Sequence, residues 1–498
     1  MSDALQTGNL NHEDAINEHV EWKHDSARLV ARFLGLLIFF SLLVTIALTA
    51  IPYGTVQPWW IAVFECVIFV IAILGVIEAS FGKSWSRKDL SLFAPLLLLT
   101  LFTVIQSLPL FSGIGPLGLG ASLSADPYGT RLFAIRLFAL IVASLLLLRY
   151  TSSKTRLRNL IYVIIGVGIA SAFFGIMRKS FQQGPGFFLP GLTIVDRSFG
   201  QFVNRNHFAF LMELCLGLTF GLIAGEIGRY RRVLVLLSVS ALLWVALTYS
   251  NSRGGILASL CQLLFLGFML DPIGHLTKTQ VSTGWRRLQN LASGLVVRVF
   301  LVVCLIAVFA YGVGWVGGEP VVFNFQQATT DFSQQEMENN ANTSRKEIWA
   351  ATWQLIKDHP VAGLGFGGYW VGITRYHNAS GAMTPQQAHN DYLELLASGG
   401  LIGCALVGWF AVLFLKRARR QLKSRDSFYR AACLGALTGL FGVGIHSFVD
   451  FGLHITINAV AAFVLIVVAA QNDLLPEANP SAGPTAGLVR GSELDQFD

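Results

Sequence analysis

The sequence predicts an all-α, polytopic membrane protein with about twelve transmembrane helices, and three observations carry this prediction. Of its 498 residues, 53% are apolar and only 13% are charged, about half the charged share of a soluble domain. The mean hydropathy is +0.58. The apolar residues also gather into runs of about 20, the length with which a helix crosses a bilayer. This composition excludes a soluble enzyme, a disordered chain and a nucleic-acid-binding module, so we expect the lipid bilayer and no nucleic acid as a partner.

Twelve apolar runs are long enough to cross the hydrocarbon core as helices. The narrowest separations are Ser250–Arg253, between the seventh and eighth runs, and His446–Gly452, between the eleventh and twelfth. The predicted spans are residues 29–51, 59–79, 90–108, 131–149, 159–177, 206–226, 233–250, 254–271, 296–316, 392–415, 430–447 and 453–470.

These spans divide the chain into five segments. The composition of the last one, rich in Pro, Gly, Ala and acidic residues, predicts disorder. The segments are a polar N-terminal segment (1–28), the first nine helices (29–316), a long loop domain (317–391), the last three helices (392–470) and the tail (471–498).

The lysine and arginine residues predict which helix ends face the cytoplasm. With the N-terminus inside, 25 of the 36 fall in interior segments and 11 fall outside, so every interior loop is basic. Basic residues collect in the cytoplasmic loops of membrane proteins. We therefore expect both termini in the cytoplasm and the loop 317–391 on the outer face of the membrane.

The loop 317–391 is far longer than any other, and a loop of that length in a compact protein usually has structure and a task. It contains a predicted helix, Ser344–His359, which ends before Pro360 and is followed by the glycine-rich run GLGFGGYW. Asn390 or Asp391 is a suitable start for the tenth span. The apolar residues that helical spacing places on one face of the loop helix are Ile348, Trp349, Trp353 and Ile356.

Polar residues from distant parts of the chain are brought by this topology to the outer end of the helices. Ionisable groups near membrane depth are costly, so each is a candidate for function. The candidates are Arg205, His207, Arg253, Arg345, His389, His446, Asp450 and His454.

Most of these residues also have a structural explanation. Arg253 would snorkel from a helix end, and Arg345 would be a solvated surface charge. His389 would brace the tenth span. Arg205 and His207 would be interfacial anchors.

The last outer turn, HSFVDFGLH, holds three possible metal ligands, His446, Asp450 and His454. A closed metal site needs more ligands at tighter spacing. We therefore favour a structural hydrogen-bond cluster at this turn and expect no metal.

Two or three outward-facing arginines suit a diphosphate, because guanidinium presents forked donors to phosphate oxygens. A histidine nearby suits proton removal from an attacking hydroxyl. A lipid diphosphate that carries a leaving sugar needs little else, since arginines can stabilise the departing charge. The outer loops contain no Asp-x-Asp pair for a divalent metal, so arginine would take its place.

Several motifs resemble the integral-membrane O-antigen ligase and polysaccharide polymerase superfamily. They are SRGG at Ser252–Gly255, SRKEIW and HPVAGLGFGG in the long loop, and His389-Asn390 followed after nine residues by Gly400-x-x-Gly403. NRNHFA at Asn204–Ala209 and HSFVDFGLHI at His446–Ile455 also resemble that superfamily, especially its exopolysaccharide polymerase branch. The resemblance covers roughly residues 30–470.

The resemblance implies a GT-C-like, metal-independent, inverting glycosyltransferase without a cofactor. It would take glycan from undecaprenyl diphosphate at the periplasmic face of a bacterial inner membrane. Carried over to this chain, it implies that Arg253 and Arg345 bind diphosphate and that His389 activates or positions the acceptor hydroxyl. The weaker implied candidates are Arg205 and His207 for the donor head group. Asn390, Tyr392 and Glu394 are implied to lie around the substrate, where Tyr392 or Glu394 would contact sugar or pack the start of the helix.

The acceptor distinguishes the possible activities within the superfamily. Another lipid-linked glycan would make the protein a polymerase, lipid A-core a ligase, and a protein hydroxyl an oligosaccharyltransferase. We favour the polymerase, with chain-length regulator or flippase proteins as candidate partners. A transporter is a remote alternative, because transporters place ionisable residues near the membrane midplane between repeated halves.

Overall fold

The structure is a computed structural model. It describes residues 27–51, 53–81, 85–110, 122–181, 198–226, 229–270, 303, 307, 345–378 and 385–471. Its regular structure is helical, apart from one isolated bridge between Phe199 and Phe202. The fold is therefore all-α, as predicted. The predicted ninth span lies outside the described residues except for Val303 and Ala307, and so do nearly all of the N-terminal segment and of the tail.

Helices occupy eleven of the twelve predicted span positions. Nine are long and apolar enough to cross a membrane, whereas α8 and α16 are shorter apolar helices. The described chain is thus a polytopic membrane protein. The helices are Ala27–Leu48, α2 (Pro58–Phe81), α3 (Arg87–Ser107), α4 (Pro127–Tyr150), α5 (Lys154–Phe181), α6 (Arg205–Gly225), α7 (Tyr230–Tyr249), α8 (Arg253–Met269), α14 (Asp391–Gln421), α15 (Ser427–His446) and α16 (Thr456–Ala470).

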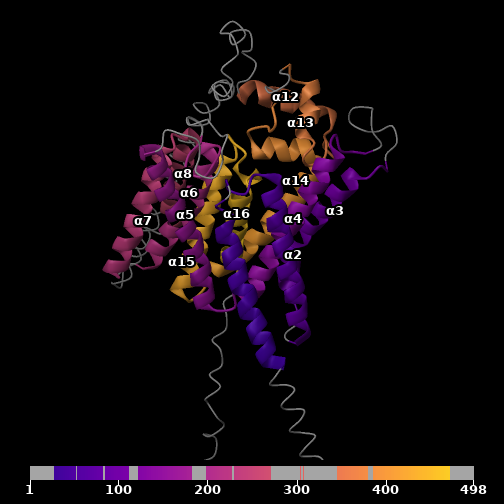
Figure 1. The fold of residues 1–498 in the computed structure, drawn as a ribbon. Coiled ribbons are helices and arrows are strands. Elements are labelled where there is room, and N and C mark those ends of the chain that lie inside the picture. Colours follow the sequence, from indigo (N-terminus) through magenta and orange to yellow (C-terminus); the bar gives the residue numbers. More distant parts are fainter. Residues whose placement is uncertain are drawn as a thin grey trace, which may run out of the picture.

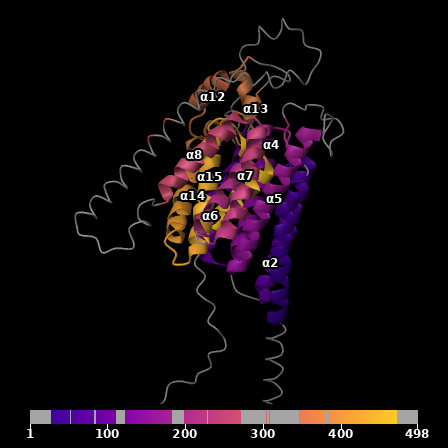
Figure 2. The ribbon, with the colours of Figure 1, turned by 90° about the vertical axis from the view of Figure 1, so that its left-hand side faces the viewer.

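Two helices outside the bundle, α12 (Arg345–Asp358) and α13 (Tyr369–Gly372), lie together at one end of it, which we call the α12 end (Figures 1 and 2). They share a small apolar core with the start of α14. The predicted loop helix is confirmed, but its predicted apolar face is partly wrong, because Trp353 is 48% exposed. The side chains that α12 buries are Arg345, Ile348, Ala351, Thr352, Leu355 and Ile356.

Helices α6 and α15 pack closely in the centre of the bundle, because small residues face each other across their contact. A Cβ on Gly217 would collide with the backbone of Gly439, and one on Gly221 with the backbone of Gly435. On each helix the two glycines are four residues apart, which is the spacing that lets membrane helices approach closely. This packing fixes the end of α6 that begins at Arg205 against the end of α15 that finishes at His446.

Helix α14 is broken at Gly400, where φ is 58° and ψ is −160°. The break frees backbone groups, and the segment Pro360–Gly365 after α12 pairs with them: Leu364 N donates to Ala397 O, and Leu401 N donates to Pro360 O. Backbone groups at membrane depth must find partners inside the protein, so the run completes the broken helix. The two glycine motifs of the sequence are therefore one structural unit.

Candidate active site

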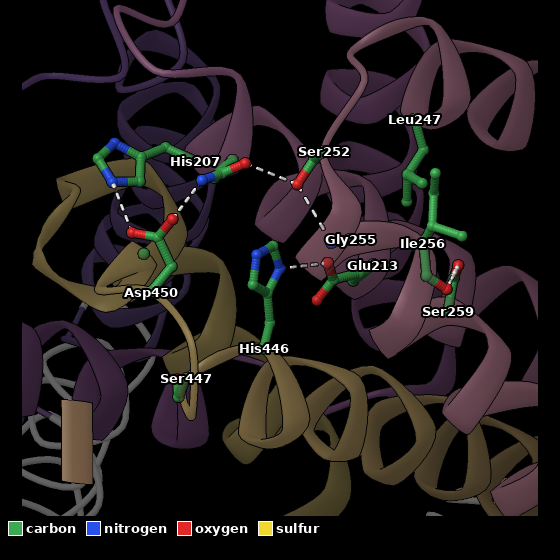
Figure 3. A network of polar contacts seen from close by, with 12 residues as sticks. His207, Glu213, Leu247, Ser252, Gly255, Ile256, Ser259, His446, Ser447 and Asp450 are labelled. Carbon is green, nitrogen blue, oxygen red and sulfur yellow. Dashed lines mark hydrogen bonds and ion pairs between the residues drawn. The ribbon is translucent and has the colours of Figure 1, made fainter. Parts of the chain in front are cut away.

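The carboxylate of Asp450 joins residues from several separate elements at the α12 end. It accepts a hydrogen bond from the side-chain amide of Asn206 on α6. Its Oδ2 lies 3.6 Å from a terminal nitrogen of Arg345 on α12, and its Oδ1 lies 3.5 Å from Nδ1 of His389. Nε2 of His207 is 4.0 Å from the same Oδ1 (Figure 3). Four polar residues thus converge on one buried carboxylate. Three of them were predicted site residues, and the fourth, Asn206, lies between the predicted Arg205 and His207 in the sequence.

The pKa of Asp450 lies well below its usual range. Burial alone would raise it, but the neighbouring His389, the guanidinium of Arg345 and His207 outweigh burial and lower it. Asp450 is therefore ionised at neutral pH. A negative charge is held between a guanidinium group and two imidazoles.

Four helices begin around this carboxylate, and three of them begin with an arginine. Arg205, Arg253 and Arg345 are the first residues of α6, α8 and α12. The α6 and α8 starts are joined by the Ser252 hydroxyl, which donates to Asn206 Oδ1 at 2.8 Å. Helix α14 begins two residues after His389. Helix N-termini carry partial positive charge and unpaired N–H groups, so the site gathers the features that bind anions.

The SRGG motif accounts for the close fit of α8 at this site. Ser252 caps the helix by accepting a hydrogen bond from Gly255 N at 3.1 Å. A Cβ on Gly254 would lie 2.5 Å from Nε2 of His446, and one on Gly255 would lie 2.6 Å from the Cβ of Ala209. The two glycines therefore let the start of α8, with Arg253, approach α6 and α15.

His389 is held in a left-handed backbone conformation, with φ at 49°. Such a conformation is uncommon for a residue other than glycine and persists only where neighbours fix it. Both backbone polar groups of the preceding residue, Ala388, are hydrogen-bonded. Glu394 accepts a hydrogen bond from Ala388 N at 2.9 Å, and Trp349 Nε1 donates to Ala388 O at 3.1 Å. The loop helix α12 and the start of α14 thus position His389 together.

Comparison with known proteins identifies the segment that carries much of this geometry. Residues 238–408 match the family model described as O-antigen ligase. Over this segment the chain is similar to the O-antigen ligase family. No curated protein matches it.

The O-antigen ligase match covers about a third of the chain and includes Arg253, Arg345 and His389. His207 and Asp450 lie outside it. The site therefore combines the matched segment with residues from α6 and from the turn between α15 and α16.

The three residues predicted around the substrate at the start of α14 make structural contacts. Asn390 is the N-cap of α14, and its Oδ1 accepts hydrogen bonds from Tyr392 N and Leu393 N, each at 3.0 Å. The Tyr392 hydroxyl donates to Gly444 O at 2.8 Å and so joins α14 to α15. Glu394 positions the loop that carries His389 through its bond to Ala388 N.

The three possible metal ligands of the last outer turn diverge, so the predicted single hydrogen-bond cluster is wrong. His446 Nδ1 lies 2.6 Å from Oε1 of Glu213 on α6, with both side chains fully buried (Figure 3). Nε2 of His454 lies 3.6 Å from Asp391 and 3.4 Å from Glu394. Of the three, only Asp450 faces Arg345, His207 and His389. No sequence pattern distinguished it from His446 and His454.

Proposed function

We propose that the protein is a metal-independent, inverting glycosyltransferase that transfers glycan from undecaprenyl diphosphate to a sugar hydroxyl at the periplasmic face of a bacterial inner membrane. The observation that carries this proposal is the meeting of four helix N-termini, three of them starting with arginine, beside the His389 and Asp450 pair. The match of residues 238–408 to the O-antigen ligase family model supports the reaction class.

The donor diphosphate fits the side of the site formed by α6, α8 and α12. Guanidinium groups bind phosphate oxygens through forked donors, and helix N-termini favour anions. Both sources of positive charge act at the same place, because Arg205, Arg253 and Arg345 are themselves the first helical residues. This arrangement supplies the positive charge that other enzymes obtain from a divalent metal.

In the proposed reaction, an acceptor hydroxyl oxygen attacks the anomeric carbon of the donor sugar from the face opposite the diphosphate. The new C–O bond forms as the bond from that carbon to the diphosphate oxygen breaks, which inverts the configuration. The hydroxyl proton passes to His389, whose Nδ1 faces Asp450 at 3.5 Å, so that Nε2 is the nitrogen that takes the proton. The electron pair of the broken bond goes to the diphosphate oxygen, and the arginines stabilise the negative charge that develops there.

The acceptor that we propose is a second lipid-linked glycan, so that repeat units of an exopolysaccharide or O-antigen are polymerised. The NRNHFA and HSFVDFGLHI motifs, which supply His207 and Asp450, support this choice. Transfer to lipid A-core is the second candidate, because the matching family model is described as O-antigen ligase.

Substitution of three residues tests the reaction. We expect Arg253→Ala, Arg345→Ala and His389→Ala each to lower transfer from a purified lipid-diphosphate donor by about 10²-fold or more. Arg→Lys at the two arginine positions should restore transfer only in part, because an ammonium group lacks the fork. Membrane insertion and thermal unfolding of each variant serve as the folding control. Full activity in the His389 variant would refute the proposed base.

Deletion of the gene distinguishes the two acceptors. Surface glycans reduced to a single repeat unit would identify a polymerase. Lipid-linked polymer that accumulates beside unmodified core would identify a ligase.

A further inference from the structure

A cavity of about 350 Å³ opens at the α12 end, and Arg205, Arg253 and Arg345 do not line it. It lies between α4, α13 and the start of α14, whereas the arginines start α6, α8 and α12. Helix α16 packs against both α4 and α6. The cavity is lined by residues two positions before and two after His389, Gln387 and Asp391.

The lining of this cavity combines flat apolar surfaces with hydrogen-bonding groups of both kinds. Trp370 is 44% exposed there, beside Phe366. Glu394 offers carboxylate oxygens, and Arg136 offers donors. Two buried polar atoms in the lining have no hydrogen-bond partner in the described part of the chain, Nε of Arg136 and Oε1 of Gln387. Buried polar atoms normally have partners, so these two indicate room for a polar ligand.

The polar groups in the lining indicate what kind of ligand this is. The carboxyl groups of Asp391 and Glu394 and the amide of Gln387 form hydrogen bonds, and the guanidinium of Arg136 disfavours a cation. The volume lies at the small end of the range for small-molecule pockets, and the polar groups disfavour a lipid chain. A neutral sugar fits, because its hydroxyls both donate and accept hydrogen bonds and its ring presents an apolar face to tryptophan.

We propose that this cavity binds the terminal sugars of the acceptor glycan and presents a hydroxyl to His389. Inversion requires the hydroxyl to attack from the side opposite the leaving diphosphate, and the cavity is lined by none of the three arginines that would bind that diphosphate. His454, which lines the cavity, and His389 contact the same Phe451 ring, with centroid distances of 5.9 and 4.8 Å. The Phe451 ring thus connects the lining of the cavity to the residue that would take the proton. This assignment rests on the proposed glycosyltransferase function.

Steady-state kinetics of full-length protein in nanodiscs test the assignment. The donor is an undecaprenyl-diphosphate-linked repeat unit, and the acceptor is a soluble glycoside of the same repeat unit. We expect Trp370→Ala to raise the acceptor KM by about tenfold, the effect of losing an aromatic anchor, and to leave the donor KM unchanged. Trp370→Phe should recover most of the loss, because it keeps an aromatic face. An unchanged acceptor KM, or a raised donor KM, would overturn the assignment.

Trp353→Ala is the matched control, because Trp353 is a similarly exposed tryptophan at the same end of the protein and does not line the cavity. It should leave both KM values unchanged. If the unmodified protein transfers no glycan, the proposed function fails and the cavity is tested by binding alone. Saturation-transfer NMR should then detect the soluble glycoside on the unmodified protein and not on Trp370→Ala, and equal signals would refute the cavity as a sugar site.

Discussion

At the scale of the single residue, the carboxylate of Asp450 faces Arg345, His207 and His389 at once. Asp450→Asn keeps the shape of the side chain and removes its charge, so it should leave Arg345 and the imidazole that takes the proton without their balancing anion. We expect the transfer rate with a purified lipid-diphosphate donor to fall by about 10²-fold or more.

The control for this substitution is Asp426→Asn. Asp426 caps α15 at the far end of the bundle, where it accepts a hydrogen bond from Phe428 N at 2.8 Å. Asparagine caps helices about as well as aspartate does, so this variant should keep its activity. Equal rates in the two variants would show that the charge of Asp450 is not used.

Asn390 provides a second test at the residue scale, because its capping role and its predicted substrate contact lead to different outcomes. Asn390→Asp and Asn390→Ser keep an oxygen that can accept from the N–H groups of Tyr392 and Leu393. Asn390→Ala removes the cap and should lower the free energy of unfolding by about 1 kcal/mol. Thermal unfolding and transfer rates of the three variants check this. Loss of activity in all three with unchanged stability would favour substrate contact instead.

At the scale of the element, the sequence predicts where helices lie better than how they are interrupted. A run of about 20 apolar residues has no other stable form in a bilayer, so the helix positions follow from composition. The break at Gly400 depends on a segment about 40 residues earlier, Pro360–Gly365, that satisfies the freed backbone groups. Periodicity within α14 carries no information about that partner. The adjacent glycines Gly399 and Gly400 were the only local signal.

Two glycines of α14 allow this break to be tested within one helix. At Gly400 the backbone is in a region that only glycine adopts readily, and a Cβ would collide with Val361 O. Gly400→Ala should therefore destabilise the protein by about 1–3 kcal/mol from the conformation alone. A Cβ on Gly408 would meet no atom within 4 Å, so Gly408→Ala should be neutral or stabilising because alanine favours helices. Thermal unfolding that ranks the two variants the other way would contradict the described break.

At the scale of the whole molecule, the candidate site is assembled from residues that are far apart in the sequence. Asn206, Arg253, Arg345, His389 and Asp450 come from five separate segments, and topology alone could place them at one end. It could not show which of them touch, because that depends on the glycine contacts between α6 and α15 and on the turn after His446. The sequence therefore predicted which residues belong to the site, but not that they meet at Asp450.

The distribution of basic residues over the two ends of the bundle leads to a prediction about sidedness. The end opposite α12 is rich in arginine and lysine, and Arg229 and Arg232 there pair with Glu226. Because basic ends face the cytoplasm, the α12 end should face the periplasm. A membrane-impermeant maleimide should therefore label Trp353→Cys in spheroplasts, since that position is 48% exposed on α12. It should label Arg232→Cys, whose side chain is 63% exposed, only after the membrane is opened. Both variants are made with Cys66→Ala, because Cys66 is an exposed cysteine. Labelling in the reverse order would place the arginines and His389 on the cytoplasmic side, where they could not act on a donor at the periplasmic face.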